Sequence, residues 1–152
     1  MNSKNPEITI LCGGRGSRMG KLTKNQQKCM LKVARKPILK YSLEEISKAF
    51  GRAKVIMVVV YKGDSIREYF GKRYKRLQLE YVTGSAEQVR LSLLAAKNFV
   101  ERENFFSLTG DIVVSGSELL NLVKVKRKDT FGTMLLSSRM EIAPTHGLVI
   151  MK

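Results

Sequence analysis

Apolar residues along this chain follow two alternating patterns. Short continuous apolar runs are typical of strands that are buried on both faces of a parallel sheet. Between these runs, apolar residues recur every three or four positions, which is typical of amphipathic helices. The predicted strands cover residues 7–12, 55–60, 77–82, 104–108, 132–137 and 147–151. The predicted helices cover about residues 37–50, 64–71, 85–100 and 115–125.

Polar pairs mark the expected helix starts. In a capping box, a serine and an acidic or amide residue three positions later satisfy each other's free backbone N–H groups. The sequence offers three such pairs, Ser65 with Glu68, Ser85 with Gln88, and Ser115 with Glu118. Pro37 suits the first turn of its helix, because proline lacks the N–H group that this turn leaves unpaired.

The alternation of strands and helices predicts an α/β fold with an open, doubly wound, mostly parallel sheet of the Rossmann-like kind. Ligands of such sheets bind beyond the carboxyl ends of the strands. The loop at Gly13, Gly84 and Asp111 each follow a predicted strand, so we expect them to meet at one edge. No internal repeat or linker divides the chain, so residues 1–152 are expected to form a single domain.

A glycine-rich loop, Gly13-Gly14-Arg15-Gly16-Ser17-Arg18, follows the first strand. Its glycines permit positive φ angles and a close approach of backbone N–H groups to an anion. Arg18 adds a planar donor fork suited to phosphate oxygens. A Walker-type loop is excluded, because Gly20-Lys21 is followed by leucine. The dinucleotide fingerprint is excluded as well, since no third glycine in the required phase opens a helix.

The loop and the residues after it resemble the sugar-1-phosphate nucleotidyltransferases, or NDP-sugar pyrophosphorylases, in their N-terminal nucleotide-binding part. The family signature is a strand, Gly-Gly-x-Gly-Thr-Arg-Leu, a spacer with threonine, a lysine and then a Lys-Pro pair. The matching residues are Gly13, Gly14, Gly16, Ser17, Arg18, Met19, Leu22-Thr23, Lys28 and Lys36-Pro37. Lys21, Gln27 and Lys32 stand where the family commonly has prolines, a difference that removes no chemistry.

The resemblance implies a Mg²⁺-dependent enzyme that moves a nucleoside monophosphate from a nucleoside triphosphate to a sugar-1-phosphate and releases pyrophosphate. Arg18 and Lys28 would be the catalytic cations, because nucleotidyl transfer depends on positioning and on neutralising charge. Asp111, after Gly110 at a strand end, would bind Mg²⁺. The nucleotide-binding residues that the resemblance implies are Leu11, Gly13, Gly14, Gly16, Ser17, Gly84 and Ser85. Taken singly, the cations would be interpreted as surface residues and Asp111 as a turn residue.

The last predicted strand carries the expected sugar contact. Gly147 matches the family glycine that approaches the sugar, and His146 stands in the position of a family tyrosine. We assign no catalytic role to His146, because the attacking phosphate is already anionic. The family's later sugar-binding glutamate and lysine and its second magnesium-binding aspartate have no counterpart here. The chain is therefore expected to be either the N-terminal part of a longer enzyme or a shortened relative that lacks the acceptor half.

Composition limits the classes of protein to which this chain can belong. The net charge of +15 attracts polyanions, but no aromatic platform or helix-turn-helix accompanies it, so we favour a hydrated basic surface over a nucleic-acid site. Cys12 and Cys29 fit no zinc pattern and are expected to be free thiols. No apolar stretch reaches the ~20 residues of a membrane-spanning helix, so we expect a cytoplasmic protein with no membrane partner. The oligomeric state stays open.

Three alternatives to the nucleotide-sugar enzyme remain at this point. The chain could be a non-catalytic nucleotide-binding or regulatory domain derived from the family, in view of the missing acceptor residues. A guanylyltransferase that acts on a cofactor-precursor phosphate has a similar loop, although the long spacer before Lys28 argues against it. A basic nucleic-acid-binding module would rest on net charge alone. Neither the base nor the sugar can be derived from these residues.

Overall fold

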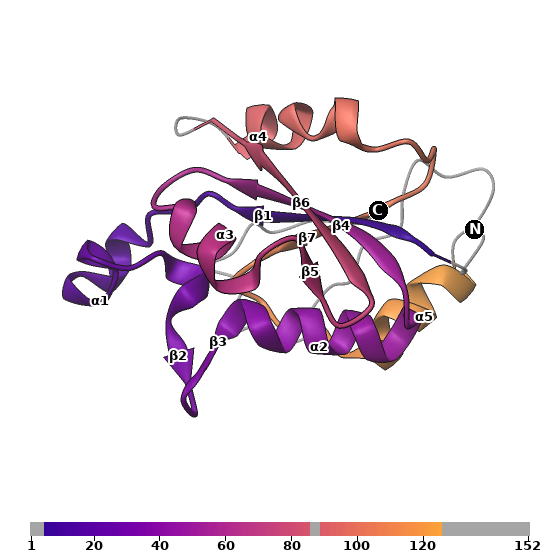
Figure 1. Cartoon of the computed structure of the whole chain (residues 1–152), viewed down its shortest axis with the longest axis horizontal. Coiled ribbons are helices and arrows are strands. Elements are labelled where there is room, and N and C mark those ends of the chain that lie inside the picture. The colour runs from indigo at the N-terminus through magenta and orange to yellow at the C-terminus, as the bar shows by residue number, and fades with distance from the viewer. Residues whose placement is uncertain (1–4, 86–88, 126–152) are drawn as a thin grey trace, which may run out of the picture.

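A five-stranded sheet forms the centre of the molecule in the computed structural model, which describes residues 5–85 and 89–125 (Figure 1). The strand order is β5-β6-β4-β1-β7. Strands β6, β4, β1 and β7 run parallel, and β5 runs antiparallel to β6. The strands of this sheet are β1 (Glu7–Cys12), β4 (Ala53–Val59), β5 (Arg73–Tyr74), β6 (Leu77–Thr83) and β7 (Phe106–Thr109).

Helices cover both faces of the sheet, with α4 on one face and α2 and α5 on the other (Figure 1). The helices are α1 (Lys21–Lys24), α2 (Ile38–Phe50), α3 (Asp64–Phe70), α4 (Val89–Ala95) and α5 (Gly116–Val125). Short 3₁₀ turns occur at η1 (Ser17–Met19), η2 (Lys28–Met30) and η3 (Lys97–Phe99). The doubly wound α/β fold predicted from the sequence is therefore confirmed.

The two faces of the sheet bury cores of different size. The larger core packs strand residues such as Ile8, Ile10 and Met57 against Leu43 and Ile46 of α2. The smaller core contains Ile56, Val58, Val82 and Ala96 on the α4 face. Because β4 contributes to both cores, it reads as a continuous apolar run rather than as an alternating one.

Residues 13–27, which follow β1, are called the phosphate loop below, and a small hairpin between this loop and α2 was not predicted. Strands β2 (Lys32–Val33) and β3 (Lys36–Pro37) pair antiparallel through a turn in which Ala34 and Arg35 have φ angles of 46° and 67°. Such left-handed turns usually contain Asn or Gly, so the residues Ala34-Arg35 did not indicate a hairpin turn in the sequence. Pro37 is consequently the N-cap of α2 and not part of its first turn.

The predicted helix starts had different outcomes. Ser115 and Glu118 form the expected capping box at α5, where the Ser115 N–H donates to the Glu118 carboxylate over 2.9 Å. The box predicted at Ser65 is wrong, because its hydroxyl donates to the Lys62 carbonyl and Gly63 precedes α3 as its N-cap. The partner expected for Ser85 lies outside the described residues.

Other boundaries shift by a few residues. The helix predicted to reach residue 100 ends at Ala95 and is followed by η3, after which Val100 is extended. Strand β4 begins earlier than predicted and β7 later, at Ala53 and Phe106. The strands predicted at 132–137 and 147–151 lie outside the described residues, as do His146 and Gly147.

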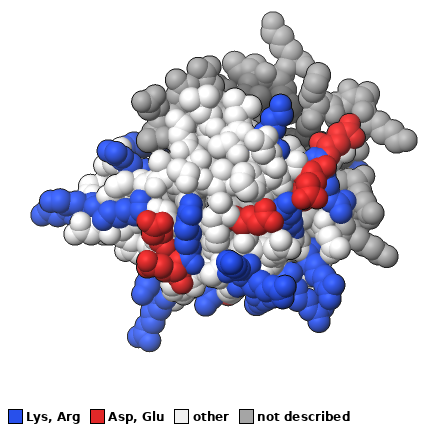
Figure 2. Space-filling view, turned by 45° about the horizontal axis from the view of Figure 1, so that its top comes forward, with Lys and Arg blue, Asp and Glu red and all other residues white. Residues whose placement is uncertain are grey.

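On the face shown in Figure 2, lysine and arginine gather along the left and lower parts, acidic side chains lie across the middle, and a broad uncharged area lies above them. Exposed apolar residues include Leu91 and Leu94 of α4, of which Leu94 is 60% exposed. Within the described part of the chain, no helix has the length and hydrophobicity that crossing a membrane requires.

Candidate functional site

The candidate site lies where the order of the strands reverses. Strand β1 pairs with β4 on one side and with β7 on the other, so the loops after β1 and β7 leave the sheet in neighbouring positions. Ligands of open α/β sheets bind at such a switch point, beyond the carboxyl ends of the strands. The Gly110 N–H donates to the Leu11 carbonyl over 2.9 Å, which joins the two strand ends directly.

A pocket of about 450 Å³ opens at this point. It is lined by Leu11, Gly14, Gly16, Ser17, Arg18, Met19, Lys28, Cys29 and Asp111. The structure thus gathers both predicted catalytic cations, the predicted metal ligand and four of the predicted nucleotide-binding residues around one cavity. These residues are separated by up to a hundred positions in the sequence and meet only because β1 and β7 are neighbours.

Gly16 fixes the shape of the phosphate loop. Its φ of +66° lies in the left-handed region, whereas Gly13 and Gly14 do not have positive φ angles, contrary to the expectation for all three. A Cβ atom at Gly16 would lie 2.9 Å from Thr23 Cγ2 and 3.3 Å from Lys28 Cβ. The buried Thr23 hydroxyl donates to the Gly16 carbonyl over 2.8 Å. Conformation and space both favour glycine here.

Gln27 connects the loop to the sheet from within the core. Its side chain is fully buried, and its Nε2 donates to the carbonyl of Cys12, the last residue of β1, over 2.6 Å. Its Oε1 accepts a hydrogen bond from the Cys29 N–H. The two hydrogen bonds hold the residues on either side of Lys28 at a fixed distance from the strand end.

Lys28 and Asp111 form an ion pair across the pocket. Lys28 Nζ donates to Asp111 Oδ2, and the two side chains are 30% and 29% exposed. Both groups are therefore accessible to a ligand while each compensates the charge of the other. Arg18, in η1, is exposed and lines the same pocket.

Two thiols pack beneath the turn that carries Asp111. A Cβ atom at Gly110 would lie 2.7 Å from the Sγ atoms of both Cys12 and Cys29. Both cysteines are buried and free, as predicted. Hydrogen bonding with the Cys29 thiol, together with burial, raises the pKa of Cys12 well above its usual value. The Cys12 thiol is therefore a packing group in the protonated state and not a nucleophile.

Gly13, Gly84 and Ser85 are not among the described residues that line the pocket. A Cβ atom at Gly13 would lie 2.9 Å from Val60 Cγ2, and one at Gly84 would lie 2.7 Å from Ser92 Oγ. The Ser92 hydroxyl also bonds the backbone N–H and carbonyl of Ser85. These positions hold the turns after β1 and β6 in close packing with their neighbours.

The donor set suits a hard divalent cation bound together with a phosphate. Within residues 5–85 and 89–125, no group of three or more His, Cys, Asp or Glu side chains could hold a metal ion alone. Asp111 is the carboxylate that lines the pocket, and Mg²⁺ usually takes one or two protein carboxylates and completes its octahedron with water and substrate phosphates. The residues present therefore fit a Mg²⁺ ion that arrives with a nucleotide.

Comparison with known proteins assigns the family. The family model described as nucleotidyl transferase matches residues 8–152, which is nearly the whole chain. The chain belongs to the nucleotidyl transferase family. Among its relatives is the bifunctional protein GlmU of Methanococcus maripaludis, which is 32% identical over 139 residues, covering 86% of this chain and 32% of GlmU. The chain thus spans about a third of the length of this relative.

A second relative and a solved structure of similar fold also match this chain. The UTP–glucose-1-phosphate uridylyltransferase AglF of Haloferax volcanii is 29% identical over 125 residues, covering 81% of this nucleotidyl transferase chain and 50% of AglF. A UTP-bound UGPase from Acinetobacter baumannii shares the fold with a TM-score of 0.65 at 19% identity. That match covers 73% of this chain and 47% of the UGPase chain.

Sequence reasoning missed the residues that support the loop. Gln27 was noted only as the residue in place of a proline, and its burial could not be derived from its polar side chain. Tyr61 was not noted at all, although its hydroxyl donates to the Lys24 carbonyl over 2.7 Å. An aromatic residue directly after a buried strand, at the edge where the ligand loops gather, was the available signal.

Proposed function

We propose that this protein binds a nucleoside triphosphate with Mg²⁺ and transfers the nucleoside monophosphate to a sugar-1-phosphate, with release of pyrophosphate. The observation that supports this most is the pocket at the switch point, which combines Arg18, Lys28 and Asp111 around the glycine-rich loop. Membership of the nucleotidyl transferase family and the uridylyltransferase activity in the name of AglF support the same class of reaction.

In the proposed reaction, an oxygen of the acceptor phosphate attacks the α-phosphorus of the triphosphate. The bond from the α-phosphorus to the oxygen that bridges to the β-phosphate breaks, and pyrophosphate leaves with the electron pair. The acceptor oxygen is already anionic, so the step needs no general base. The protein contributes positioning and charge neutralisation, which are the main sources of rate in such transfers.

Arg18 and Lys28 would neutralise the negative charge of the leaving pyrophosphate. The backbone N–H groups of Gly14, Gly16 and Ser17 would donate hydrogen bonds to the phosphates. Asp111 would hold a Mg²⁺ ion, which supplies positive charge to the phosphate oxygens. The Lys28–Asp111 ion pair would then separate, and each side chain would find an opposite charge on the ligand. Leu11 lines the pocket beside these groups, and Gly147 stays the proposed sugar contact.

The proposal also covers the organisation of the chain. Residues 1–152 would form one nucleotide-binding α/β domain. A domain that binds the nucleotide without turnover is the second candidate.

A ligand-binding experiment tests the nucleotide half of the proposal. Thermal unfolding of the 152-residue chain would be measured with ATP, CTP, GTP, UTP and dTTP, each with and without Mg²⁺. A ligand at about 100 times its Kd stabilises the native state by ~2.7 kcal/mol. We expect a Mg²⁺-dependent rise in Tm with one base, and UTP is the first to try because of the names of the relatives.

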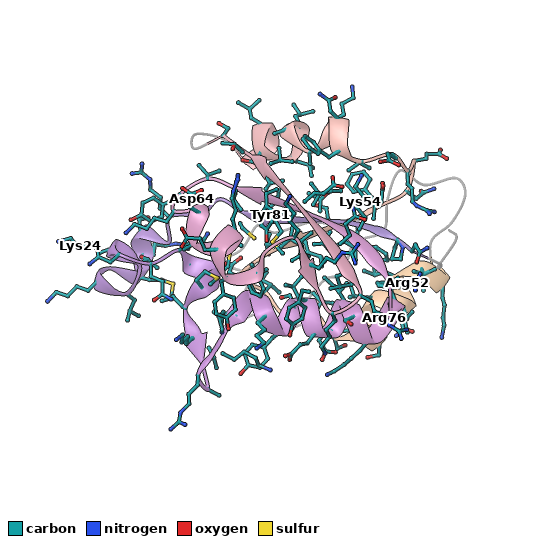
Figure 3. The ribbon with its side chains drawn as sticks, in the orientation of Figure 1. Lys24, Arg52, Lys54, Asp64, Arg76 and Tyr81 are labelled. Carbon is teal, nitrogen blue, oxygen red and sulfur yellow. The ribbon has the colours of Figure 1, made fainter. Side chains whose placement is uncertain are left out.

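Two arginines make a matched pair for this test. We expect Arg18→Ala to weaken triphosphate binding about 10- to 100-fold, because a charge-assisted hydrogen bond contributes ~1.5–3 kcal/mol. Arg52 is also exposed but precedes β4 at the amino ends of the strands, far from the pocket, so Arg52→Ala should bind like the wild type (Figure 3). Equal binding by both variants would contradict the assigned site.

Turnover separates the two candidate functions. Pyrophosphate release would be followed with the preferred triphosphate and glucose-1-phosphate. Release that Asp111→Asn abolishes would establish the transferase, whereas Mg²⁺-dependent binding without release would favour the binding domain. A preference for GTP with no sugar-phosphate acceptor would instead favour the guanylyltransferase.

A further inference from the structure

The segment after β4 packs against the outer side of the phosphate loop. Cys12 and Val59, the last residues of β1 and β4, are paired in the sheet, so the two chains leave it side by side. The side chain of Val60 reaches the Cα of Gly13 so closely that a Cβ atom there would lie 2.9 Å from Val60 Cγ2. Tyr61 is the next residue and extends this contact along the loop.

Tyr61 contacts both arms of the loop. Its hydroxyl donates to the carbonyl of Lys24, the last residue of α1, over 2.7 Å. Its ring lies beneath the guanidinium of Arg15, whose Cζ is 5.5 Å from the ring centroid. Arg15 belongs to the arm that enters the loop, and Lys24 to the arm that returns from it. One side chain therefore connects the two arms.

A second residue connects the same arms from within. The buried Thr23 donates its hydroxyl to the Gly16 carbonyl, so the loop is held between Thr23 on its inner side and Tyr61 on its outer side. Ser17 and Arg18, which line the pocket, lie in the sequence between Gly16 and Thr23, the two residues that the inner hydrogen bond joins. Their position therefore depends on both.

The cations around Tyr61 are separate from those of the pocket. Arg15, Lys24 and Lys62 are exposed, and Lys62 Nζ lies 5.6 Å from the Tyr61 ring centroid. None of them, nor Tyr61, is among the described residues that line the pocket. Tyr61 therefore acts on the loop and not on the ligand. The Arg15 guanidinium makes a cation–π contact with the Tyr61 ring, and Arg15 does not line the pocket. The cations that line the pocket are Arg18 and Lys28.

We infer that Tyr61 is a positioning residue for triphosphate binding, which fixes the phosphate loop so that Ser17 and Arg18 face the phosphates. The inference rests on the proposed function, because it assumes that the pocket binds a triphosphate. A loop that is ordered before the ligand arrives loses less conformational freedom on binding, and affinity rises accordingly.

Substitution of Tyr61 tests the inference, with inorganic tripolyphosphate plus Mg²⁺ as a probe that needs no base contacts. We expect Tyr61→Phe, which keeps the ring and loses the hydrogen bond, to weaken tripolyphosphate binding about 2- to 10-fold. We expect Tyr61→Leu, which also loses the cation–π contact, to weaken it about 5- to 50-fold. The affinity for the preferred nucleoside triphosphate should fall by a similar factor, whereas the affinity for the corresponding monophosphate should stay unchanged.

Tyr81 provides the matched control. Its hydroxyl donates to the Gly71 carbonyl over 2.6 Å, and Arg67 Cζ lies 5.5 Å from its ring centroid. The same kinds of contact are therefore made to α3 and the residue after it, and not to the phosphate loop. Tyr81→Phe should lower the Tm about as much as Tyr61→Phe and leave phosphate binding unchanged.

The outcomes separate the inference from the proposed function. If the wild type binds neither tripolyphosphate nor any triphosphate, the proposed function fails and the inference fails with it. If the wild type binds and both Tyr61 variants bind as tightly, the inference alone is overturned. Tyr61→Phe decides the question if Tyr61→Leu does not fold. An equal loss of monophosphate affinity would also overturn the inference, because it would indicate general damage to the pocket.

Discussion

At the scale of single residues, the site depends on Gly110 as much as on the charged side chains. Gly110 is buried, its N–H bonds the end of β1, and its missing side chain makes room for two thiols. The position of Asp111 therefore depends on the close packing of the residue before it. The sequence showed Gly110 only as half of a strand-end Gly-Asp pair.

Gly110→Ala should lower the free energy of unfolding by about 1–3 kcal/mol, because a Cβ atom there would lie 2.7 Å from both sulfur atoms. Urea unfolding measures this change. Adding Cys29→Ala should recover part of the loss, since it removes one of the two clashes. Gly14→Ala is the control, because a Cβ atom there would meet nothing within 4 Å. If both glycine variants lose the same stability, the packing account is wrong.

At the scale of elements, the sequence predicted a helix start well where side chains form hydrogen bonds with the backbone of their own segment. The Ser115–Glu118 box is formed as predicted because its two residues need only each other. The hairpin β2–β3 and strand β5 were missed because they are two residues long and depend on turns without glycine. Strands are usually recognised in a sequence by the length of an apolar run and by the turn residues beside it, and neither signal was present at these short strands.

Ser115→Ala should destabilise the protein by about 1 kcal/mol, because it removes the side-chain acceptor at the start of α5. The Glu118 N–H, which donates to the Ser115 hydroxyl over 3.3 Å, would lose that partner. Chemical denaturation followed by circular dichroism gives the value. Ser115→Thr keeps a hydroxyl at the cap and should retain most of the stability. A loss of equal size in both variants would argue against capping as the cause.

At the scale of the whole molecule, the parallel topology predicted from the sequence was enough to bring Gly16, Arg18 and Asp111 to one edge. What could not be predicted was which glycines line the pocket. Gly13 and Gly84 pack against Val60 and Ser92, and such contacts depend on the neighbouring strand and helix. Sequence patterns predict where strands occur along the chain, whereas the contacts between neighbouring strands require the folded sheet.

The titrating groups predict a stability maximum between about pH 5 and pH 9. Contacts with Lys36, Lys48 and Lys54 lower the pKa of Glu44, Glu45 and Glu101 from 4.5, so these carboxylates contribute stability above that value and lose it as the pH falls. Burial raises the pKa of Tyr74 and Tyr81 from 10.0 to about 12, so their contribution is lost as the pH rises through that range.

Urea unfolding at a series of pH values checks this profile. The raised pKa of Cys12 adds to the alkaline loss from about pH 9, because the unfolded chain releases that proton first. Tyr81→Phe removes one of the titrating groups and should make the alkaline decline less steep. A profile that is unchanged in this variant would show that Tyr81 does not contribute to it.

Gln27 determines when the phosphate loop acquires its shape. A proline in that position, as is common in the family that the sequence resembles, would restrict the backbone in the unfolded chain as well as in the folded one. Gln27 connects the loop to the sheet through its hydrogen bond to the Cys12 carbonyl, which exists only once β1 and the loop have reached their folded positions. The attachment of the phosphate loop to the end of β1 is therefore absent from the newly made chain and forms together with the core.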